Sequence, residues 1–379
     1  MCKEGPLRSN PGPAPTAHVL GSPAARCGAR VRKEGPLRSN PGPAPTAHVL
    51  GSPAARCGAR VRKEGPLRSK PGPNSPVKAR EGLSYAAAGV DIAAYEAALE
   101  RVRPLIEAAS GRIGEFAGTY ELPGLGHLVA SADGVGTKIK VAIALGRHRG
   151  IGADLVNHCV NDIAVMRARP LFFLDYFATG KLDPDVFEDV VAGIASACRE
   201  AGAALLGGET AEMPGLYALG DYDLAGFIVG LVEAGRLPDT ATVKPGDLLV
   251  GLPSAGLHTN GFSLVRKAFE GAALPEELLA PHRSYLADLH ELRWKTAAHV
   301  TGGGIPGNLP RALPPGLGYR LDRSAWAVPP IFQEIQERGR VSDEEMLGTF
   351  NLGIGMVLVV DPQATPAGRS VIGEVVAQA

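Results

Sequence analysis

Most of the first 73 residues are copies of one 30-residue unit, and this limits which part of the chain can build a packed core. Lys3–Arg32 recurs unchanged as Lys33–Arg62, and a partial third copy, Lys63–Pro73, differs only at Lys70. Residues 1–83 contain 14 Pro and 11 Gly but no Phe, Tyr or Trp. A stacked repeat must bury an apolar face, which this unit lacks. We therefore expect residues 1–83 to be a disordered tail and the fold to lie in residues 84–379.

Charge separates the same two parts. Residues 1–83 hold 15 Lys and Arg against 4 Asp and Glu, whereas residues 84–379 hold 24 against 35. An acidic body argues against a nucleic-acid surface, and the basic tail has no aromatic side chains to stack on bases. The proline density forbids the amphipathic helix of a transit peptide. Identity between the copies favours a recent DNA duplication, with the start codon placed too far upstream.

Composition excludes two further classes. The most apolar segments, Leu224–Val232 and Ile354–Val360, are short and interrupted by glycine, which indicates buried strands and no membrane span. The five cysteines show no CxxC or Cys/His ligand spacing, so we expect neither a disulfide scaffold nor a structural zinc site. This usage fits a reducing cytoplasm.

Residues 84–379 alternate between helical and strand-like patterns, which predicts α/β or α+β layers. Helices are expected after Asp91 (with Pro104 kinking or ending the first one), at Ile151–Ala168, from Pro184 to just before Gly202 with Asp183 as N-cap, and at Phe262–Phe269, Leu309–Leu313 and Ile331–Arg338. Strands are expected at Leu128–Ala132, Leu171–Tyr176, Ala203–Leu206, Leu224–Val232, Leu248–Leu252, Leu317–Leu321, Ile354–Val360 and Val371–Val376. The turn-rich segment Leu237–Asp247 predicts a boundary between domains at 84–240 and 241–379.

A segment that contains an aspartate and two glycines directly follows the expected strand Leu128–Ala132. In the segment Asp133–Lys138 (DGVGTK), two glycines let the backbone approach a ligand, the aspartate can hold Mg²⁺ and the lysine can meet a phosphate. A tight Asp-Gly turn with a solvated lysine is the alternative. Asn161-Asp162, inside an otherwise apolar helix, is a second metal or phosphate candidate, or else a polar outer face.

Three later loops are further candidates. Gly207–Gly215 (GGETAEMPG) places Glu209 and Glu212 three residues apart between glycines, as in loops that bind a cation or an amine. Ser254–Gly261 (SAGLHTNG) could hold an anion at the N-terminus of the next helix, or could simply cap it. Thr301–Asn308 (TGGGIPGN) formally matches the GxGxxG pattern of dinucleotide sites, but Pro306 makes a poor crossover helix, so an anion-holding glycine loop is preferred.

Nine segments in order carry a family resemblance. They are SY with AGVD (Ser84–Asp91), DGVGTK, CVND (Cys159–Asp162), PLFFLDYFATGKL (Pro170–Leu182), GGETAEMPG, DYDLAGF (Asp221–Phe227), HTNGFSLVRK (His258–Lys267), HVTGGG (His299–Gly304) and TFNLGIGM (Thr349–Met356). Together they resemble the phosphoribosylformylglycinamidine cyclo-ligase family, also called aminoimidazole ribonucleotide synthetases. The resemblance covers Ser84–Ala379.

That resemblance implies a cytoplasmic homodimer with a two-domain α/β fold, joined through strands of the N-terminal domain. The implied reaction is the ATP-driven closure of formylglycinamidine ribonucleotide to 5-aminoimidazole ribonucleotide, with release of ADP and phosphate and with Mg²⁺ as cofactor. Matched to the family's motifs, the implied ATP-binding residues are Asp133, Gly134, Gly136, Thr137, Lys138, Asn161, Asp162, Gly208 and Glu209, with Asp133, Asp162 and Glu209 on the metal. The implied substrate-binding residues are Thr210, Glu212, His258, Thr259, Asn260 and Gly303, and the implied catalytic residues are Lys138, Glu212 and His258.

The sequence departs from the family pattern at three places, and two other classes of function are open. Arg167 stands where relatives usually carry glycine, the segment around Gly271–Glu277 looks shortened, and the chain stops after VIGEVVA where relatives run a little further. The same fold serves other ATP-dependent enzymes, namely the amidotransferase that makes this substrate, selenophosphate synthetase and thiamine-phosphate kinase. A non-enzymatic ligand-binding protein is a third class. The segments PLFFLDYFATGKL and GGETAEMPG favour the cyclo-ligase.

Overall fold

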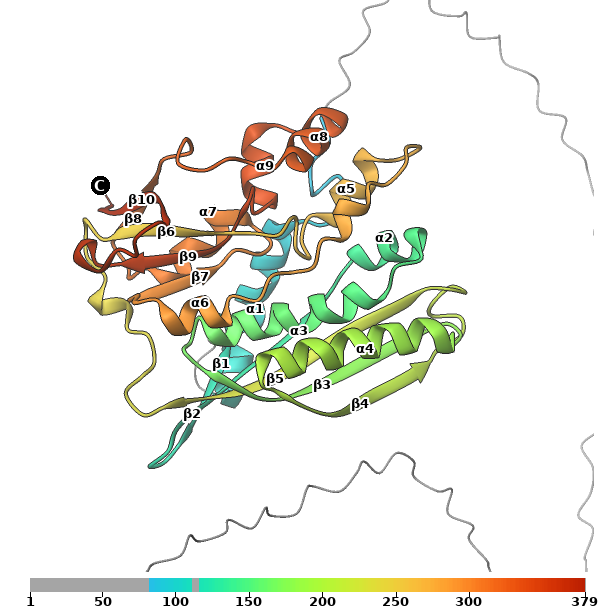
Figure 1. The fold of residues 1–379 in the computed structure, drawn as a ribbon, viewed down its shortest axis with the longest axis horizontal. Helices are drawn as coiled ribbons and strands as arrows, with labels where there is room; N and C mark the ends of the chain where they lie inside the picture. Colours follow the sequence, from blue (N-terminus) through green and yellow to red (C-terminus); the bar gives the residue numbers. More distant parts are fainter. Residues whose placement is uncertain (1–81, 111–115, 379) are drawn as a thin grey trace, which may run out of the picture. The chain divides into compact units, whose positions relative to one another are not determined.

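The computed structural model describes residues 82–110 and 116–378, and in this part of the chain two five-stranded sheets dominate (Figure 1). The first has the order β1-β2-β5-β3-β4, with only β3 and β4 parallel, and its strands are β1 (Gly118–Leu122), β2 (Gly126–Gly134), β3 (Arg169–Thr179), β4 (Ala204–Glu212) and β5 (Tyr222–Glu233). The second is antiparallel, in the order β7-β9-β6-β10-β8, and its strands are β6 (Leu248–Pro253), β7 (Thr296–His299), β8 (Leu317–Leu321), β9 (Ile354–Val360) and β10 (Ser370–Ala377). The predicted two-domain α/β fold is confirmed.

The helices follow the capping signals where these are strong. They are α1 (Ile92–Ser110), α2 (Lys138–Leu145), α3 (Arg149–Ala164), α4 (Pro184–Ala201), α5 (Phe262–Ala268), α6 (Leu286–Glu291), α7 (Gly304–Asn308), α8 (Pro330–Gly339) and α9 (Asp343–Thr349). Helix α4 begins as predicted, because the Asp183 carboxylate accepts from the backbone N–H groups of Asp185 and Val186. It ends at Gly202, which adopts the left-handed conformation with φ 70°.

Helix α3 is buried on nearly all sides because it lies between the two halves of the fold. Figure 1 shows α3 and α4 along one face of the first sheet. The apolar side of α3, including Leu155 and Cys159, packs in the core of that sheet. Its polar residues Asp154, His158 and Asp162 recur at a spacing of four and form a second stripe, which the C-terminal half covers. The polar stripe of α3 is thus an internal surface, not a solvent face.

Several local predictions differ from the structure. Helix α1 does not end early at Pro104 but continues through it to Ser110. The expected glycine and glutamate loop at 207–212 is instead the second half of β4, held by parallel pairing with β3, so tertiary pairing overrides a composition that suggests a turn. Strands β1 and β7 and helices α2, α6 and α9 carry too little periodicity to be predicted. The expected helix Leu309–Leu313 is a 3₁₀ turn at Leu309–Ala312, after α7.

No described residue covers much of the face of the first sheet opposite α3, and this face is partly apolar. Phe227 of β5 pairs with Leu174 of β3 and Ala132 of β2, and the two large side chains, Phe227 and Leu174, are 46% and 37% exposed. Gly226, the neighbour of Phe227, faces α3, where an added Cβ would meet Leu155 at 3.0 Å. Phe227 therefore points to the open face.

The predicted tail lies almost wholly outside the described residues. Leu83, assigned above to that tail, belongs to the fold: its backbone N–H donates to Gly339 O at 2.9 Å, and its side chain packs against the cluster built by α5, α8 and α9. No described helix is long and apolar enough to cross a membrane.

Candidate active site beside strand β2

Asp133 lies near the end of β2, directly before a glycine turn. The turn runs from Gly134 to Thr137 and leads into α2. Gly136 adopts φ +66° with open space where a Cβ would be, and the Thr137 hydroxyl lies 3.1 Å from that of Ser263. The backbone of this turn can therefore approach a ligand closely.

Asp162 reaches Asp133 from helix α3. Its Oδ1 accepts from His299 Nδ1 at 2.8 Å, and its Oδ2 accepts from the Ser131 hydroxyl at 3.3 Å. Burial alone would raise the pKa of Asp162, but these contacts and the neighbouring histidines outweigh it and lower the pKa. Burial and the negative charge of Asp162 raise the pKa of Asp133 to about 6, against the opposing effect of His158. Two carboxylates so close together suit a cation that neutralises both.

Four histidines from four segments adjoin these carboxylates. His158 (α3), His258, His282 and His299 (β7) are all buried. His158 Nε2 lies 3.4 Å from Asp133 Oδ2, and His158 Nδ1 lies 2.9 Å from the Thr259 hydroxyl. The rings of His258 and His282 stack with centroids 4.0 Å apart. Burial and the surrounding cationic side chains hold the pKa values of His258 and His282 well below the usual value, so both imidazoles are neutral.

A pocket of about 740 Å³ lies next to this network, because residues that follow Thr259 and His299 in the sequence line it. Asn260 follows Thr259, and Gly302 and Gly303 follow β7 and His299; all three line the pocket together with residues of α1. An added Cβ at Gly302 would lie 3.3 Å from Asn260 Oδ1, so the glycine allows this approach. The structure thus brings Asp133, Asp162, His258, Thr259, Asn260 and Gly303 into one region.

Lys138 and Asn161, by contrast, face into the protein. The Lys138 ammonium lies 2.7 Å from Asp154 Oδ2 and donates to Ala280 O at 2.9 Å, with neither side chain of the ion pair exposed. Burial lowers the pKa of Lys138 and raises that of Asp154, each opposed by the partner's charge. The Asn161 amide donates to Arg283 O and accepts from Tyr285 N–H, and so fixes α3 to the segment before α6.

The predicted residues on β4 lie elsewhere. Asp133 pairs with Gly226, Gly226 with Asp175, and Asp175 with Gly208, so β4 is three strands away from β2. At about 4.8 Å per strand this is roughly 14 Å. Gly208, Glu209, Thr210 and Glu212 are exposed, and Glu212 Oε1 accepts from Leu182 N–H at 2.7 Å. Glu209 therefore does not share a metal with Asp133 within one chain.

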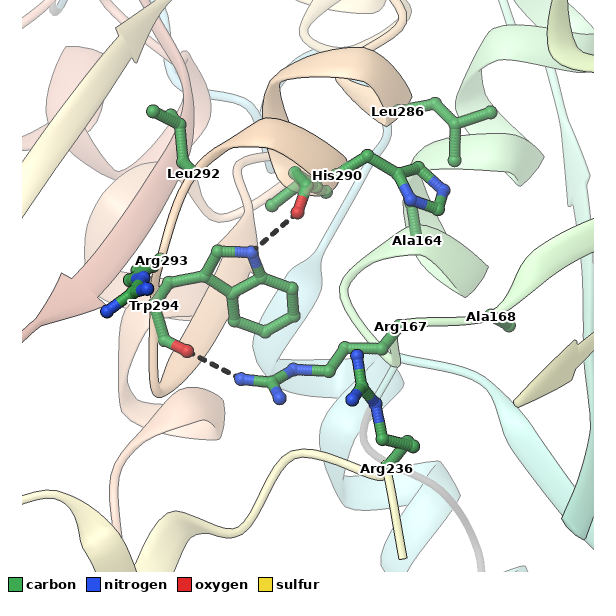
Figure 2. A pocket seen from close by; sticks show the side chains of 10 residues that line it. Ala164, Arg167, Ala168, Arg236, Leu286, His290, Leu292, Arg293 and Trp294 are labelled. Atoms are coloured by element: carbon green, nitrogen blue, oxygen red, sulfur yellow. Dashed lines mark hydrogen bonds between the residues drawn. The ribbon is translucent and has the colours of Figure 1, made fainter. Parts of the chain in front are cut away.

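Arg167, which stands where related sequences usually carry glycine, holds a backbone conformation that favours glycine. The residue adopts φ 62°, the left-handed region that glycine occupies without strain. Figure 2 shows its side chain running alongside the ring of Trp294. The guanidinium carbon lies 4.4 Å from the ring centroid, and Nη2 donates to Trp294 O at 2.5 Å. These contacts hold the strained residue in place.

Sequence reasoning missed His158, His282 and His299 as members of the site. Two local signals were present: His158 and Asp162 stand four residues apart on one helix, and His299 opens the segment HVTGGG. The other histidines come from distant segments, and only the fold brings them together.

Comparison with known proteins identifies the family and the fold. Residues 114–232 match the N-terminal domain of AIR synthase related proteins, and residues 244–379 match their C-terminal domain. Among solved structures, tt0281 from Thermus thermophilus is 21% identical with a TM-score of 0.51, covering 75% of this chain and 94% of that one. The hydrogenase maturation protein HypE from E. coli is also 21% identical, with a TM-score of 0.52 and coverage of 74% and 92%. Thiamine monophosphate kinase from Aquifex aeolicus is 15% identical, with a TM-score of 0.53 and coverage of 72% and 92%.

The three structures share the fold of this chain. The first match ends at residue 232 and the second begins at residue 244. The chain belongs to the AIR synthase-related superfamily.

Proposed function

We propose that this chain is an ATP-dependent cyclo-ligase of purine biosynthesis, which closes formylglycinamidine ribonucleotide to 5-aminoimidazole ribonucleotide and releases ADP and phosphate. The observation that carries the proposal is the meeting of Asp133 and Asp162 beside the Gly134–Thr137 turn, next to the pocket lined by Asn260 and Gly303. The nine motif segments and both family matches support it. One structure with the same fold is described as AaThiL complexed with AMPPCP and TMP, which supports a nucleotide as ligand.

The chemistry fits a site built from carboxylates and backbone groups. The formyl oxygen of the substrate is a poor leaving group, and phosphorylation by ATP makes it a good one, after which the amidine-side nitrogen closes the ring. Asp133 and Asp162 would hold Mg²⁺, which neutralises phosphate charge when bound. The backbone at Gly134 and Gly136 would approach the phosphates. Catalysis then depends mainly on positioning and charge neutralisation.

Two sets of predicted residues take indirect roles in this proposal. Lys138 and Asn161 position the site by fixing α2 and α3 against residues 280–285. Glu209, Thr210 and Glu212 lie on β4, away from Asp133, and would contact a ligand there separately from the Asp133 site. Asn260 lines the proposed substrate pocket, and His258 and Thr259 stand directly before it in the chain as buried residues.

We further propose that the chain forms a homodimer through the open face of the first sheet. Tyr120, Leu174, Leu206 and Phe227 are large apolar side chains of this sheet that are 37% to 69% exposed. A sheet face with so much exposed apolar surface is typical of an association surface.

A substrate panel tests the function. We expect ATP hydrolysis with formylglycinamidine ribonucleotide and Mg²⁺. We expect none with thiamine monophosphate, with selenide, or with formylglycinamide ribonucleotide plus glutamine. Hydrolysis dependent on one of the latter substrates would assign the chain to another enzyme of the superfamily. Hydrolysis with none of them would favour a binding protein.

A further inference from the structure

We infer that His258, His282 and His299 form a binding site for a divalent transition metal ion, with Zn²⁺ as the reference ion. The three are buried, and one ring nitrogen of each lies within 4.8 Å of one ring nitrogen of the other two. In a tetrahedral site with Zn–N distances of 2.0–2.1 Å, ligand nitrogens lie about 3.3 Å apart. A site of this size therefore needs only small side-chain adjustments to close around an ion.

The hydrogen bonds around His282 and His299 direct one nitrogen of each ring toward the other ring. His299 Nδ1 faces the ionised Asp162 at 2.8 Å and therefore carries the proton. His158 Nε2 faces the Asp133 carboxylate at 3.4 Å and is a donor, so His158 Nδ1 accepts from the Thr259 hydroxyl. Thr259 then has only acceptor capacity left for His282 Nδ1, which lies 3.3 Å away and carries the proton.

This arrangement leaves the Nε2 lone pairs of His282 and His299 facing each other at 3.0 Å. Two lone pairs at that distance repel each other unless a cation lies between or beside them. While Asp133 is ionised, the opposite orientation of the Thr259 hydroxyl would place a lone pair of His158 Nε2 against its carboxylate instead. A carboxylate or hydroxyl that holds the remote nitrogen of a histidine is the usual outer partner of a metal-bound imidazole.

His258 supplies the third ligand. Its Nε2 accepts from Ala255 N–H at 3.4 Å, which places the proton of the neutral ring on Nδ1, and Nδ1 is buried with no hydrogen-bond partner among the described residues. A metal ion on Nδ1 therefore requires that proton to move to Nε2, with loss of the long hydrogen bond from Ala255. A buried ring nitrogen without a partner costs free energy that a metal bond would recover. The residue also adopts φ 61°, a conformation that non-glycine residues hold only where the surroundings enforce it.

The ligand set decides the class of ion. Three imidazole nitrogens suit Zn²⁺, Co²⁺ or Ni²⁺, whereas Mg²⁺ requires oxygen ligands such as Asp133 and Asp162. Three protein ligands also leave one coordination position open. The inference does not depend on the proposed cyclo-ligase reaction, since the site is defined by its own side chains.

Metal titration of the full-length protein tests the inference without any activity measurement. We expect the metal-free chain to bind one more equivalent of Co²⁺ than the His282→Ala variant, with the visible absorption bands of tetrahedral Co²⁺. Zn²⁺ should displace the ion, and excess Mg²⁺ should not. His290→Ala, which removes a histidine outside the cluster, is the matched control and should bind like the wild-type protein. Thr259→Val should weaken Co²⁺ binding by about 10-fold to 100-fold, the range for loss of an outer partner.

Zinc X-ray absorption on the wild-type protein provides a variant-free test, should His282→Ala fail to fold. The inference predicts three imidazole nitrogens at about 2.0–2.1 Å. Equal Co²⁺ binding by wild type and a folded His282→Ala variant, or a zinc shell made of sulfur or carboxylate ligands, would overturn it.

Discussion

Lys138 and Asp154 form an ion pair with 2.7 Å between nitrogen and oxygen, and both side chains are completely buried between α2 and α3. Lys138 ends the segment DGVGTK, whose composition suggested a phosphate-binding loop, but its side chain is buried and pairs with Asp154 of α3. The pair places the Gly134–Thr137 turn against the same helix that carries Asp162, and it thereby links the sequence motif to the geometry of the site.

The first prediction concerns this pair. Lys138→Met leaves the Asp154 carboxylate buried without its partner and should destabilise the protein by about 3–5 kcal/mol, measured by urea unfolding. Lys140→Met is the matched control, since Lys140 pairs with Asp221 at a partly exposed position, and it should cost less than about 1 kcal/mol. The double variant Lys138→Met with Asp154→Leu should recover much of the loss. Equal unfolding midpoints for the two single variants would contradict the structural role of Lys138.

The second prediction concerns Asp133. Asp133→Asn keeps the shape of the side chain but removes the charge that a metal needs, so turnover should fall by about 100-fold or more while the fold survives. Raising Mg²⁺ should recover part of the activity. Steady-state kinetics at two Mg²⁺ concentrations measures this, with the turn residue Asp322→Asn as control. Near-wild-type turnover at the lower concentration would remove Asp133 from the site.

The third prediction concerns pH. Because the pKa of Asp133 is raised to about 6 in the folded protein, its carboxyl binds a proton more tightly in the folded than in the unfolded chain. Its contribution to stability is therefore present at low pH and declines as pH rises through about 6. Mg²⁺ competes with that proton, so activity should rise through about pH 6, and the midpoint should move down as Mg²⁺ increases. A profile that does not respond to Mg²⁺ would separate Asp133 from the metal.

The fourth prediction concerns assembly. Phe227→Asp places a charge on the open face of the first sheet and should convert the dimer to a monomer, as measured by light scattering at micromolar concentration. Leu219→Asp changes a residue that is 82% exposed in the loop between β4 and β5 and should leave the dimer intact. A wild-type protein with the mass of a monomer would refute the dimer.

The fifth prediction concerns the N-terminal repeat. A chain that begins at Gly82 should keep the melting temperature and activity of the full-length protein, because the first contacts of the described fold are made by Gly82, which lies against the backbone of Arg340, and by Leu83. A chain that begins at Ser84 loses this hydrogen bond and apolar contact and should melt a few degrees lower. Loss of folding in the Gly82 chain would show that the repeat supports the structure.

The sequence predicted those elements whose signals are local. Helix α4 could be predicted because Asp183 caps its N-terminus and Gly202 follows its C-terminus. Strands β8 and β9 were predicted with their observed bounds because turns flank their apolar runs. Strand β4 was not predicted beyond Leu206, since its glycines and glutamates become a strand only by pairing with β3. Strand β7, with the sequence TAAH, is a strand only because it pairs with β9.

The site was predictable only in part, for a similar reason. Asp133, Asp162, Asn260 and Gly303 stand in glycine-rich or otherwise polar motifs, and the structure places them in one region. The burial of Lys138 depends on Asp154, which no motif contains. The histidine cluster shows no ligand spacing because its members lie on separate segments from α3 to β7.

The most direct test of the proposed reaction is its stoichiometry. Formylglycinamidine ribonucleotide, ATP and Mg²⁺ are incubated with the protein, and 5-aminoimidazole ribonucleotide, ADP and phosphate are quantified together. The account predicts that the three products form in equal amounts and that no ADP forms when the substrate is left out. ADP formation that continues without the substrate, or substrate-dependent ADP formation without 5-aminoimidazole ribonucleotide, would contradict it.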